Sequence, residues 1–157
     1  RRSQAVPGPH TTPQTGGSRA VTFLVERLAE LRRHIEHLRA IRSRVRDGRQ
    51  LAADLSLQND VLFSLLVVCQ SVIDIAGELA ARRGIRFQDF TGAIRALGQV
   101  DGFPADLIDQ LLPLPGFRNI VVHEYVELDY QRVIQALDGL EPVEAFIAAV
   151  SRLELKS

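Results

Sequence analysis

The chain has 157 residues and a formal net charge of zero, and 46% of its residues are hydrophobic, with two Tyr and no Trp. This length suits one domain with an aliphatic core, and the neutral charge argues against a protein that coats nucleic acid through bulk electrostatics. No uninterrupted apolar run reaches the roughly 18 residues of a membrane span. We therefore expect a cytoplasmic protein that makes no contact with a membrane.

Residues 1–20 differ in composition from the rest of the chain. They hold three prolines among Gly, Ser, Thr and Gln, and few apolar side chains. Such a segment cannot bury enough apolar surface to offset the entropy lost on ordering its backbone. We expect a disordered N-terminal tail over residues 1–20 and one helical domain over residues 21–157.

The next segment has the apolar spacing of a long helix. Apolar residues recur three or four positions apart, interrupted once at Arg42, and they are Val21, Leu24, Leu28, Leu31, Ile35, Leu38 and Val45. A seam this narrow is typical of a helix that packs against one other helix. We predict a helix of roughly 25 residues here, ended by Gly48.

A second long helix is predicted with Ser56 as its N-cap and Gly84 as the residue after its C-cap. Residues 61–68 are apolar almost all round the helix, so it should be the central and most buried one. Cys69, in the same run, should be a buried and inert thiol rather than a nucleophile.

A thin polar stripe crosses this second helix at i, i+4 spacing, formed by Gln70, Asp74, Glu78 and Arg82. In one interpretation it is a solvated surface with an ordinary Glu78–Arg82 pair. In the other it lines a functional groove, with Gln70 and Asp74 as the groove residues.

Shorter segments follow. One helix is predicted over residues 90–97 and stops at Gly98. Another has Pro104 at its first position and ends within residues 112–116. A last helix begins at Asp129, and Pro142 either kinks this helix or starts a further one. Between them, β-branched residues at 120–122 fit a strand locally. A lone strand would leave its backbone groups unpaired, so we predict a helix over residues 117–125 and an all-α fold.

Residues 117–125 also carry a dense group of reactive side chains, namely Arg118, Asn119, His123 and Tyr125. On a continuous helix, Arg118 and His123 lie about 140° apart and do not share a face. Asn119 and His123 do share one, and Arg118 and Tyr125 lie along one edge. A second copy related by a two-fold axis would bring two such sets into one cleft, which makes a composite site attractive without requiring it.

If RNA lies in such a cleft, these residues suffice to cleave it without a metal or a cofactor. His123 would take the proton from a 2′-hydroxyl that attacks the adjacent phosphorus. Arg118 would stabilise the charge on the phosphoryl oxygens, and Asn119 would orient His123 or bind phosphate. In the structural alternative, His123 caps or satisfies a buried polar network and Arg118 pairs with an acid such as Asp74.

Two further patterns have weaker functional interpretations. Arginines concentrated in residues 39–49 form either an RNA-binding patch or a solvated helix face. His34 and His37 are spaced to share a metal ion, but no acidic or Cys partner is apparent, so we predict no metal site.

The motif and its surroundings resemble a known family. The segments that carry the resemblance are residues 60–62, 70–76, 84, 116–125 and 128–129, with the signature Arg-x4-His-x-Tyr at Arg118, His123 and Tyr125. They are similar to the HepT-type toxins, which are HEPN-domain proteins catalogued as DUF86. The resemblance extends over roughly residues 21–155.

This resemblance implies an up-and-down helical bundle that forms a two-fold homodimer, with Arg118 and His123 as the catalytic residues of a metal-independent endoribonuclease. It also implies a type VII-like toxin–antitoxin system, in which a minimal nucleotidyltransferase antitoxin uses ATP to transfer AMP to Tyr125 and silences the toxin. Phosphate beside Arg118 would compete with RNA. The alternative function is a non-catalytic helical dimer that binds the nucleotidyltransferase or a nucleotide in the same cleft.

Overall fold

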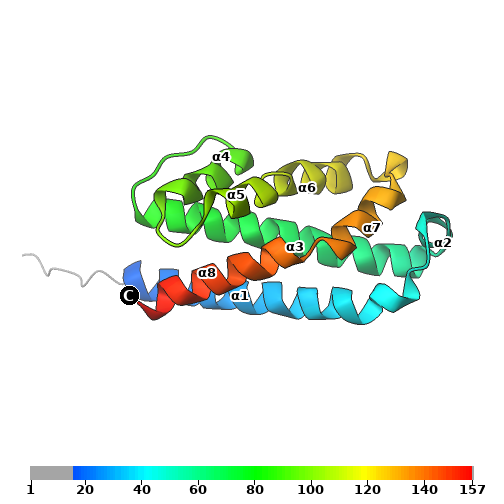
Figure 1. Ribbon diagram of the computed structural model, residues 1–157, viewed down its shortest axis with the longest axis horizontal. Helices are drawn as coiled ribbons and strands as arrows, with labels where there is room; N and C mark the ends of the chain where they lie inside the picture. Colours follow the sequence, from blue (N-terminus) through cyan, green and yellow to red (C-terminus); the bar gives the residue numbers. More distant parts are fainter. Residues whose placement is uncertain (1–15, 157) are drawn as a thin grey trace, which may run out of the picture.

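Figure 1 shows the protein as a computed structural model, which describes residues 16–156. The described residues contain helices and no strand, so the all-α prediction and the choice of helix over strand after residue 117 are confirmed. The α-helices are α1 Gly16–Ile41, α2 Gly48–Ala53, α3 Leu55–Arg82, α4 Phe90–Arg95, α5 Ala105–Leu111, α6 Leu114–His123, α7 Tyr130–Asp138 and α8 Glu141–Leu155. The 3₁₀ helices are η1 Arg42–Arg44, η2 Ala96–Gln99 and η3 Tyr125–Glu127.

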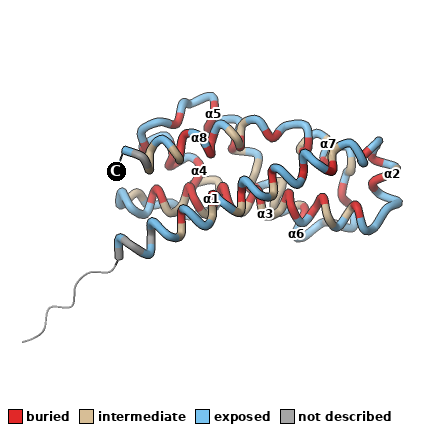
Figure 2. The backbone as a smooth tube through the Cα atoms, turned by 90° about the horizontal axis from the view of Figure 1, so that it is seen from below, coloured by how far each residue is buried: buried red, intermediate tan, exposed pale blue. Residues whose placement is uncertain are grey.

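The two longest helices, α1 and α3, form the frame of the bundle and run side by side in opposite directions (Figure 1). The predicted seam of α1 faces inward, and Leu24, Leu31 and Leu38 have no exposed surface. Figure 2 shows how buried positions recur along the inner side of α1 between exposed ones. Burying a leucine side chain stabilises a fold by about 1.5–3 kcal/mol, so this seam supplies much of the packing between the two helices.

The ends of α1 differ from the prediction. Residues 16–20, assigned to the tail, belong to α1, and the rest of the predicted tail lies outside the described residues. The helix ends at Ile41, and Gly48 begins α2 instead of ending α1. The reason is that the Asp47 carboxylate accepts a hydrogen bond from Gln50 N at 2.8 Å and caps a new helix. Arg42, the interruption in the seam, turns outward and donates two hydrogen bonds to Asp138.

The central helix is α3, as predicted. It is long and apolar enough to cross a membrane, but 61% of its most apolar window is buried inside the bundle, as a core helix requires. The prediction that Ser56 is its N-cap is wrong. The carboxylate of Asp54 accepts a hydrogen bond from Leu57 N at 3.0 Å, so the helix begins at Leu55.

After α3 the chain returns along it as α4, α5 and α6 (Figure 1). The helix predicted over residues 90–97 is confirmed as α4 followed by η2, but its predicted stop at Gly98 is wrong, because η2 continues through Gly98 to Gln99. Pro104 is the N-cap of α5 and not its first helical residue. Residues 114–116, expected to end that helix, form the first turn of α6, where the missing N–H of Pro115 removes no helical hydrogen bond.

The last two helices complete the bundle. Asp129 is the predicted start, and its carboxylate accepts a hydrogen bond from Gln131 N at 2.9 Å as the N-cap of α7. Pro142 lies in the first turn of α8, so it starts a further helix and does not kink one. α8 is tied to α1 by a hydrogen bond from Arg32 to Ser151 and by an ion pair of Arg39 with Glu144.

The C-terminus of α3 is closed by a Schellman motif, as Gly84 predicted. The N–H groups of Gly84 and Ile85 donate to the carbonyl oxygens of Ala81 and Ala80, at 3.1 and 3.0 Å. Gly84 has a φ of 66°, in the left-handed region that glycine adopts without strain.

We predict that Gly84→Ala lowers the free energy of unfolding by about 1–2 kcal/mol, because an L side chain is strained at that φ. Urea unfolding followed by circular dichroism measures the loss. Gly116→Ala is the matched control, since Gly116 is helical and no atom lies within 4 Å of an added Cβ. The control should match or slightly exceed the wild-type stability. Equal losses in the two variants would contradict the special role of Gly84.

Candidate functional site

The motif residues occupy the outward side of α6. At 100° per residue, Arg118, Val122, Asn119 and His123 follow one another around an arc of about 140°. Asn119, Val122 and His123 are exposed, Arg118 is half-buried at one edge of the arc, and Val121 faces the bundle. The alternative in which His123 satisfies a buried polar network is therefore wrong.

Arg118 is held by three neighbouring side chains. Its Nε donates to Oε1 of Gln70 at 3.1 Å, and its Nη1 donates to Oδ1 of Asn119 at 3.0 Å. Its Cζ lies 5.2 Å from the ring centroid of Phe90, within the range of a cation–π contact. Among the described residues, nothing is hydrogen-bonded to Nη2, so part of a fixed guanidinium is available to an anion.

Gln70 and Asp74, the predicted groove residues, stand behind Arg118 on α3. Gln70 Nε2 donates to Asp74 Oδ1 at 2.8 Å, and Asp74 Oδ2 lies 3.7 Å from Arg27 Nε on α1. Arg118 thus reaches Asp74 through Gln70 and not as a direct ion pair. These contacts join α6, α3 and α1 into one polar chain.

His123 is the last residue of α6. No hydrogen bond joins it to Asn119 among the described residues; the side-chain oxygen of Asn119 accepts its hydrogen bond from Arg118. The helix then breaks at Glu124, and η3 begins at Tyr125. The expected position of Arg118 and Tyr125 along one helix edge is therefore wrong, because it required α6 to continue through Tyr125. The side chain of Tyr125 lies outside the described part of the chain.

Arg118 and His123 do not meet within one chain. The guanidinium turns toward Gln70 of α3 and Phe90 of α4, whereas the imidazole extends from the exposed end of α6. A single copy therefore presents a fixed guanidinium and an exposed imidazole at separate places on one helix surface.

The rest of the polar stripe and the basic segment make structural contacts. Arg82 pairs with Glu78 at 3.4 Å and with Glu154 at 3.2 Å, so this end of the stripe is a surface ion-pair cluster. In the segment of residues 39–49, Arg39 and Arg42 pair with acids of the C-terminal helices. Because these two arginines are paired, fewer arginines of the segment are available to bind RNA than the sequence suggested.

His34 and His37 each contact a side chain of α3. His34 Nδ1 lies 2.9 Å from Ser64 Oγ and its Nε2 lies 3.3 Å from Glu30, while His37 Nε2 lies 2.7 Å from Asp60 Oδ1. Acidic partners that the sequence did not reveal are thus present. No group of three or more metal-ligating side chains occurs in the described residues.

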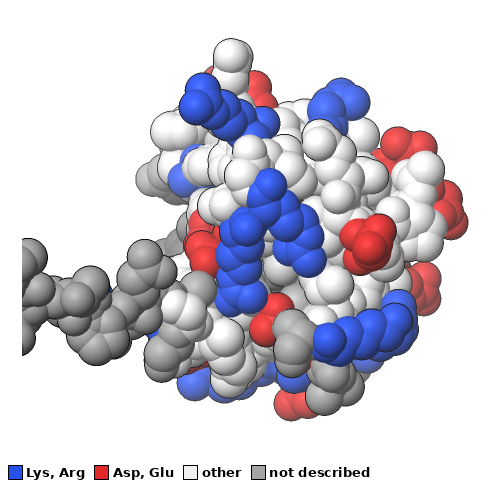
Figure 3. All heavy atoms as spheres, turned by 90° about the vertical axis from the view of Figure 1, so that its left-hand side faces the viewer, with Lys and Arg blue, Asp and Glu red and all other residues white. Residues whose placement is uncertain are grey.

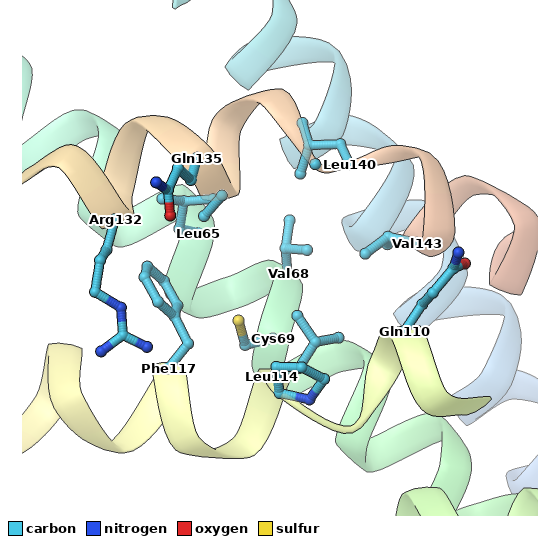
Figure 4. Close-up of a pocket in the computed structure, with 13 residues that line it drawn as sticks. Leu65, Val68, Cys69, Gln110, Leu114, Phe117, Arg132, Gln135, Leu140 and Val143 are labelled. Carbon is cyan, nitrogen blue, oxygen red and sulfur yellow. The ribbon is translucent and has the colours of Figure 1, made fainter. Parts of the chain in front are cut away.

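A hollow of about 260 Å³ lies between α6 and the helices α3, α7 and α8 (Figure 4). None of the motif's polar residues lines it; its walls are mostly apolar, with Arg132 and Gln135 among the polar lining residues. Cys69 lies in the wall, and burial raises the pKa of its thiol to about 12. The prediction of a buried thiol is confirmed, and at neutral pH it stays protonated and unreactive.

This arrangement of helices and motif matches a known family. The family model described as Ribonuclease HepT-like matches residues 31–150, most of the chain. The chain belongs to this family. The resemblance to HepT-type toxins noted in the sequence is thereby confirmed.

Similar proteins and structures extend the comparison of this HepT-like chain. It is 29% identical over 130 residues to the mRNA nuclease HepT of Shewanella oneidensis, covering 82% of this chain and 96% of that protein. A crystal structure of a toxin–antitoxin with AMP-PNP has a TM-score of 0.74 at 27% identity, covering 83% of this chain and 98% of that one. The tri-AMPylated S. oneidensis HEPN toxin in complex with MNT antitoxin has a TM-score of 0.72 at 28% identity, covering 83% and 97%.

Two residues that contact Arg118 or Asp74 were not predicted from the sequence. Arg27 lies on the polar face of α1, where it resembles any solvated arginine, and Phe90 begins a short helix far from the motif in sequence. Periodicity gives no signal for either residue, because each reaches the site through tertiary packing.

A double-mutant cycle tests the bond between Arg118 and Gln70. We predict that Arg118→Ala and Gln70→Ala are less than additive, with a coupling free energy of about 0.5–1.5 kcal/mol, because both side chains are only half-buried. Urea unfolding of the two single variants and the double variant gives the value. Glu78→Ala combined with Arg118→Ala is the control and should be additive. A coupling as small as that of the control would show that the bond does not persist in solution.

Proposed function

We propose that this chain is a metal-independent endoribonuclease toxin of a type VII-like toxin–antitoxin system, acting on RNA in the cytoplasm. The observation that carries the proposal is the fixed guanidinium of Arg118 and the exposed imidazole of His123 on one outward arc of α6, in a HepT-like chain. The name of the S. oneidensis relative supports mRNA as the substrate class.

The active unit in this proposal is a homodimer, because one copy leaves Arg118 and His123 apart. Three exposed apolar side chains support a partner surface beside the motif. Phe63, 62% exposed, lies on the same stripe of α3 as Gln70 and Asp74; Val122 lies on the motif arc; and Val126, 83% exposed, follows it. Large apolar side chains that gather on an exposed surface are typical of a site that contacts another protein chain.

In the cleft, each motif residue has a defined part. Neutral His123 takes the proton of a 2′-hydroxyl, and the 2′-oxygen attacks the adjacent phosphorus. The bond to the 5′-oxygen of the next nucleotide breaks, and that oxygen takes a proton from His123 of the second copy or from water. The products are a 2′,3′-cyclic phosphate and a 5′-hydroxyl. Arg118 stabilises the charge that builds up on the phosphoryl oxygens, and Asn119 keeps the guanidinium in place.

Regulation in this proposal acts through Tyr125. A minimal nucleotidyltransferase antitoxin transfers AMP from ATP to the phenol oxygen, with release of pyrophosphate. The added phosphate and nucleoside compete with RNA for the cleft. The similar structure of a tri-AMPylated HEPN toxin bound to MNT antitoxin supports this part.

A second candidate function is a non-catalytic helical dimer that binds the nucleotidyltransferase or a nucleotide in the same cleft. One observation favours it: Arg118 and His123 make no contact within a chain, an arrangement that a binding surface tolerates as it stands. Cleavage measurements separate the two candidates.

We predict that His123→Ala lowers the rate of RNA cleavage by about 10²–10⁴-fold, because it removes the general base. The measurement is single-turnover cleavage of an RNA in the presence of EDTA, beside the same sequence with a 2′-deoxy nucleotide at the cut, which should resist. His37→Ala is the matched control, a histidine on α1 whose side chain is 43% exposed, and should cleave like the wild type.

Mixing the inactive variants tests the dimer. Co-expressed Arg118→Ala and His123→Ala chains should recover part of the activity if the site is shared between copies, and should stay inactive if each copy works alone. Equal cleavage by the wild type and His123→Ala would exclude catalysis by this residue and leave the binding dimer.

We also predict that Tyr125→Phe remains toxic in cells but is no longer silenced by the nucleotidyltransferase, because phenylalanine lacks the accepting oxygen. Intact mass spectrometry of each protein, produced together with the nucleotidyltransferase, measures the added AMP. Growth of the cells measures toxicity. Tyr130→Phe is the control for the other tyrosine and should still be modified. AMP found on Tyr125→Phe would place the modification elsewhere.

A further inference from the structure

A second hollow, of about 390 Å³, lies beside the Arg118 contact chain and is walled by aromatic rings. Its floor is formed by Ile73 and Ala93, which are buried, and by Gly77. Its remaining lining residues are Phe23, Arg27, Asp74, Phe87 and Phe90. The volume falls in the range of small-ligand pockets.

The aromatic walls are open to solvent. Phe87 and Phe90 are 40% and 39% exposed, although both rings have buried apolar surface next to them. Gly77 makes room for one of them: a Cβ on Gly77 would lie 3.2 Å from Cζ of Phe87. The ring of Phe87 thus lies close over the α3 backbone, at the side of an accessible hollow.

We propose that this hollow, the base pocket, receives one unstacked nucleobase of a single-stranded RNA whose backbone passes Arg118. Aromatic faces at an open surface stack on bases of any sequence. Arg27 and Asp74 also line the pocket, with Arg27 Nε 3.7 Å from Asp74 Oδ2. The remaining guanidinium donors and carboxylate lone pairs can meet base edges of either hydrogen-bonding type. That the ligand is RNA rests on the proposed function. The arrangement of aromatic rings that would stack on a base does not depend on it.

Phe90 connects the base pocket to the motif. The Arg118 Cζ lies 5.2 Å from the centroid of the Phe90 ring, and the Phe90 side chain also lines the pocket. A nucleotide whose base enters the pocket therefore has its phosphate near Arg118. Because a base inside a duplex cannot leave its stack without loss of pairing, the pocket selects unpaired RNA.

Positive charge for the flanking phosphates is present at the same end of the bundle. Arg86 directly precedes Phe87, is exposed, and forms no ion pair within the described residues. Figure 3 shows Lys and Arg side chains spread over this end of the molecule, interspersed with Asp and Glu. Local arginines thus supply the phosphate attraction that the neutral chain as a whole lacks.

The experiment measures binding of a short 2′-O-methyl oligonucleotide, which cannot be cut because its nucleophile is blocked. One version carries the fluorescent base 2-aminopurine at its centre, and a second is abasic there. The wild-type protein should bind the first version about 5- to 150-fold more tightly, the range for one stacked base, and should quench its fluorescence. Phe87→Leu should lose both effects, whereas Phe87→Tyr should keep them.

Leu55→Ala is the matched control, because Leu55 is 66% exposed at the opposite end of α3, roughly 33 Å from Gly77 along the helix. It should bind like the wild type. Equal binding of the two oligonucleotides, or unchanged binding by folded Phe87→Leu, would overturn the base pocket. A weaker self-association of Phe87→Leu with unchanged binding would assign the hollow to the interface between copies, which also overturns it.

The cleavage assay with His123→Ala tests the nuclease function independently of this binding measurement. A protein that cleaves RNA but does not distinguish the abasic oligonucleotide keeps its nuclease function and lacks the base pocket. A protein that cleaves nothing but binds through the stacked base keeps the pocket and loses the nuclease function.

Discussion

The constraint on which the structure depends is the burial of α3. This helix is apolar almost all round, so other helices must cover nearly all of its surface, and α1, the α4–α6 segment and the α7–α8 segment do so on different sides. One stripe is left open, with Phe63, Gln70 and Asp74 along it. The need to cover α3 therefore decides where α6 lies, and with it the place at which Arg118 emerges beside Gln70.

Arg118 illustrates how packing prepares a polar group for chemistry. A half-buried guanidinium without partners would destabilise the bundle, because its donors would be partly removed from water. Gln70, Asn119 and Phe90 satisfy most of it and also restrict its rotamers. In the described residues no buried side-chain polar atom lacks a hydrogen bond, so the part of the guanidinium without a protein partner is accessible to solvent. The contacts that make the fold tolerate Arg118 also hold it in the orientation in which it would meet a phosphate.

Local patterns predicted the elements of this fold better than their ends. The i, i+3, i+4 seam of α1 and the continuous apolar surface of α3 identified the two frame helices, and Gly84 marked the end of α3 because its left-handed φ is a local property. The helix starts at Leu55 and Gly48 were missed, since the capping carboxylates of Asp54 and Asp47 were not distinguished from other surface acids. The motif was found by residue type and spacing. Its supports, Arg27 and Phe90, come from other helices, and no pattern along the chain reports such contacts.

Phe90 links Arg118 to the base pocket. Its side chain contacts the guanidinium of Arg118 and also walls the hollow under Phe87. A nucleotide whose base stacks in that hollow brings its phosphate to Arg118, and a guanidinium that shifts away from Phe90 alters the pocket wall. His123, at the free end of α6, makes no contact with either group in its own chain. In the proposed function, recognition and charge stabilisation would therefore lie in one copy around Phe90, and a second copy would bring its His123 to the same phosphate.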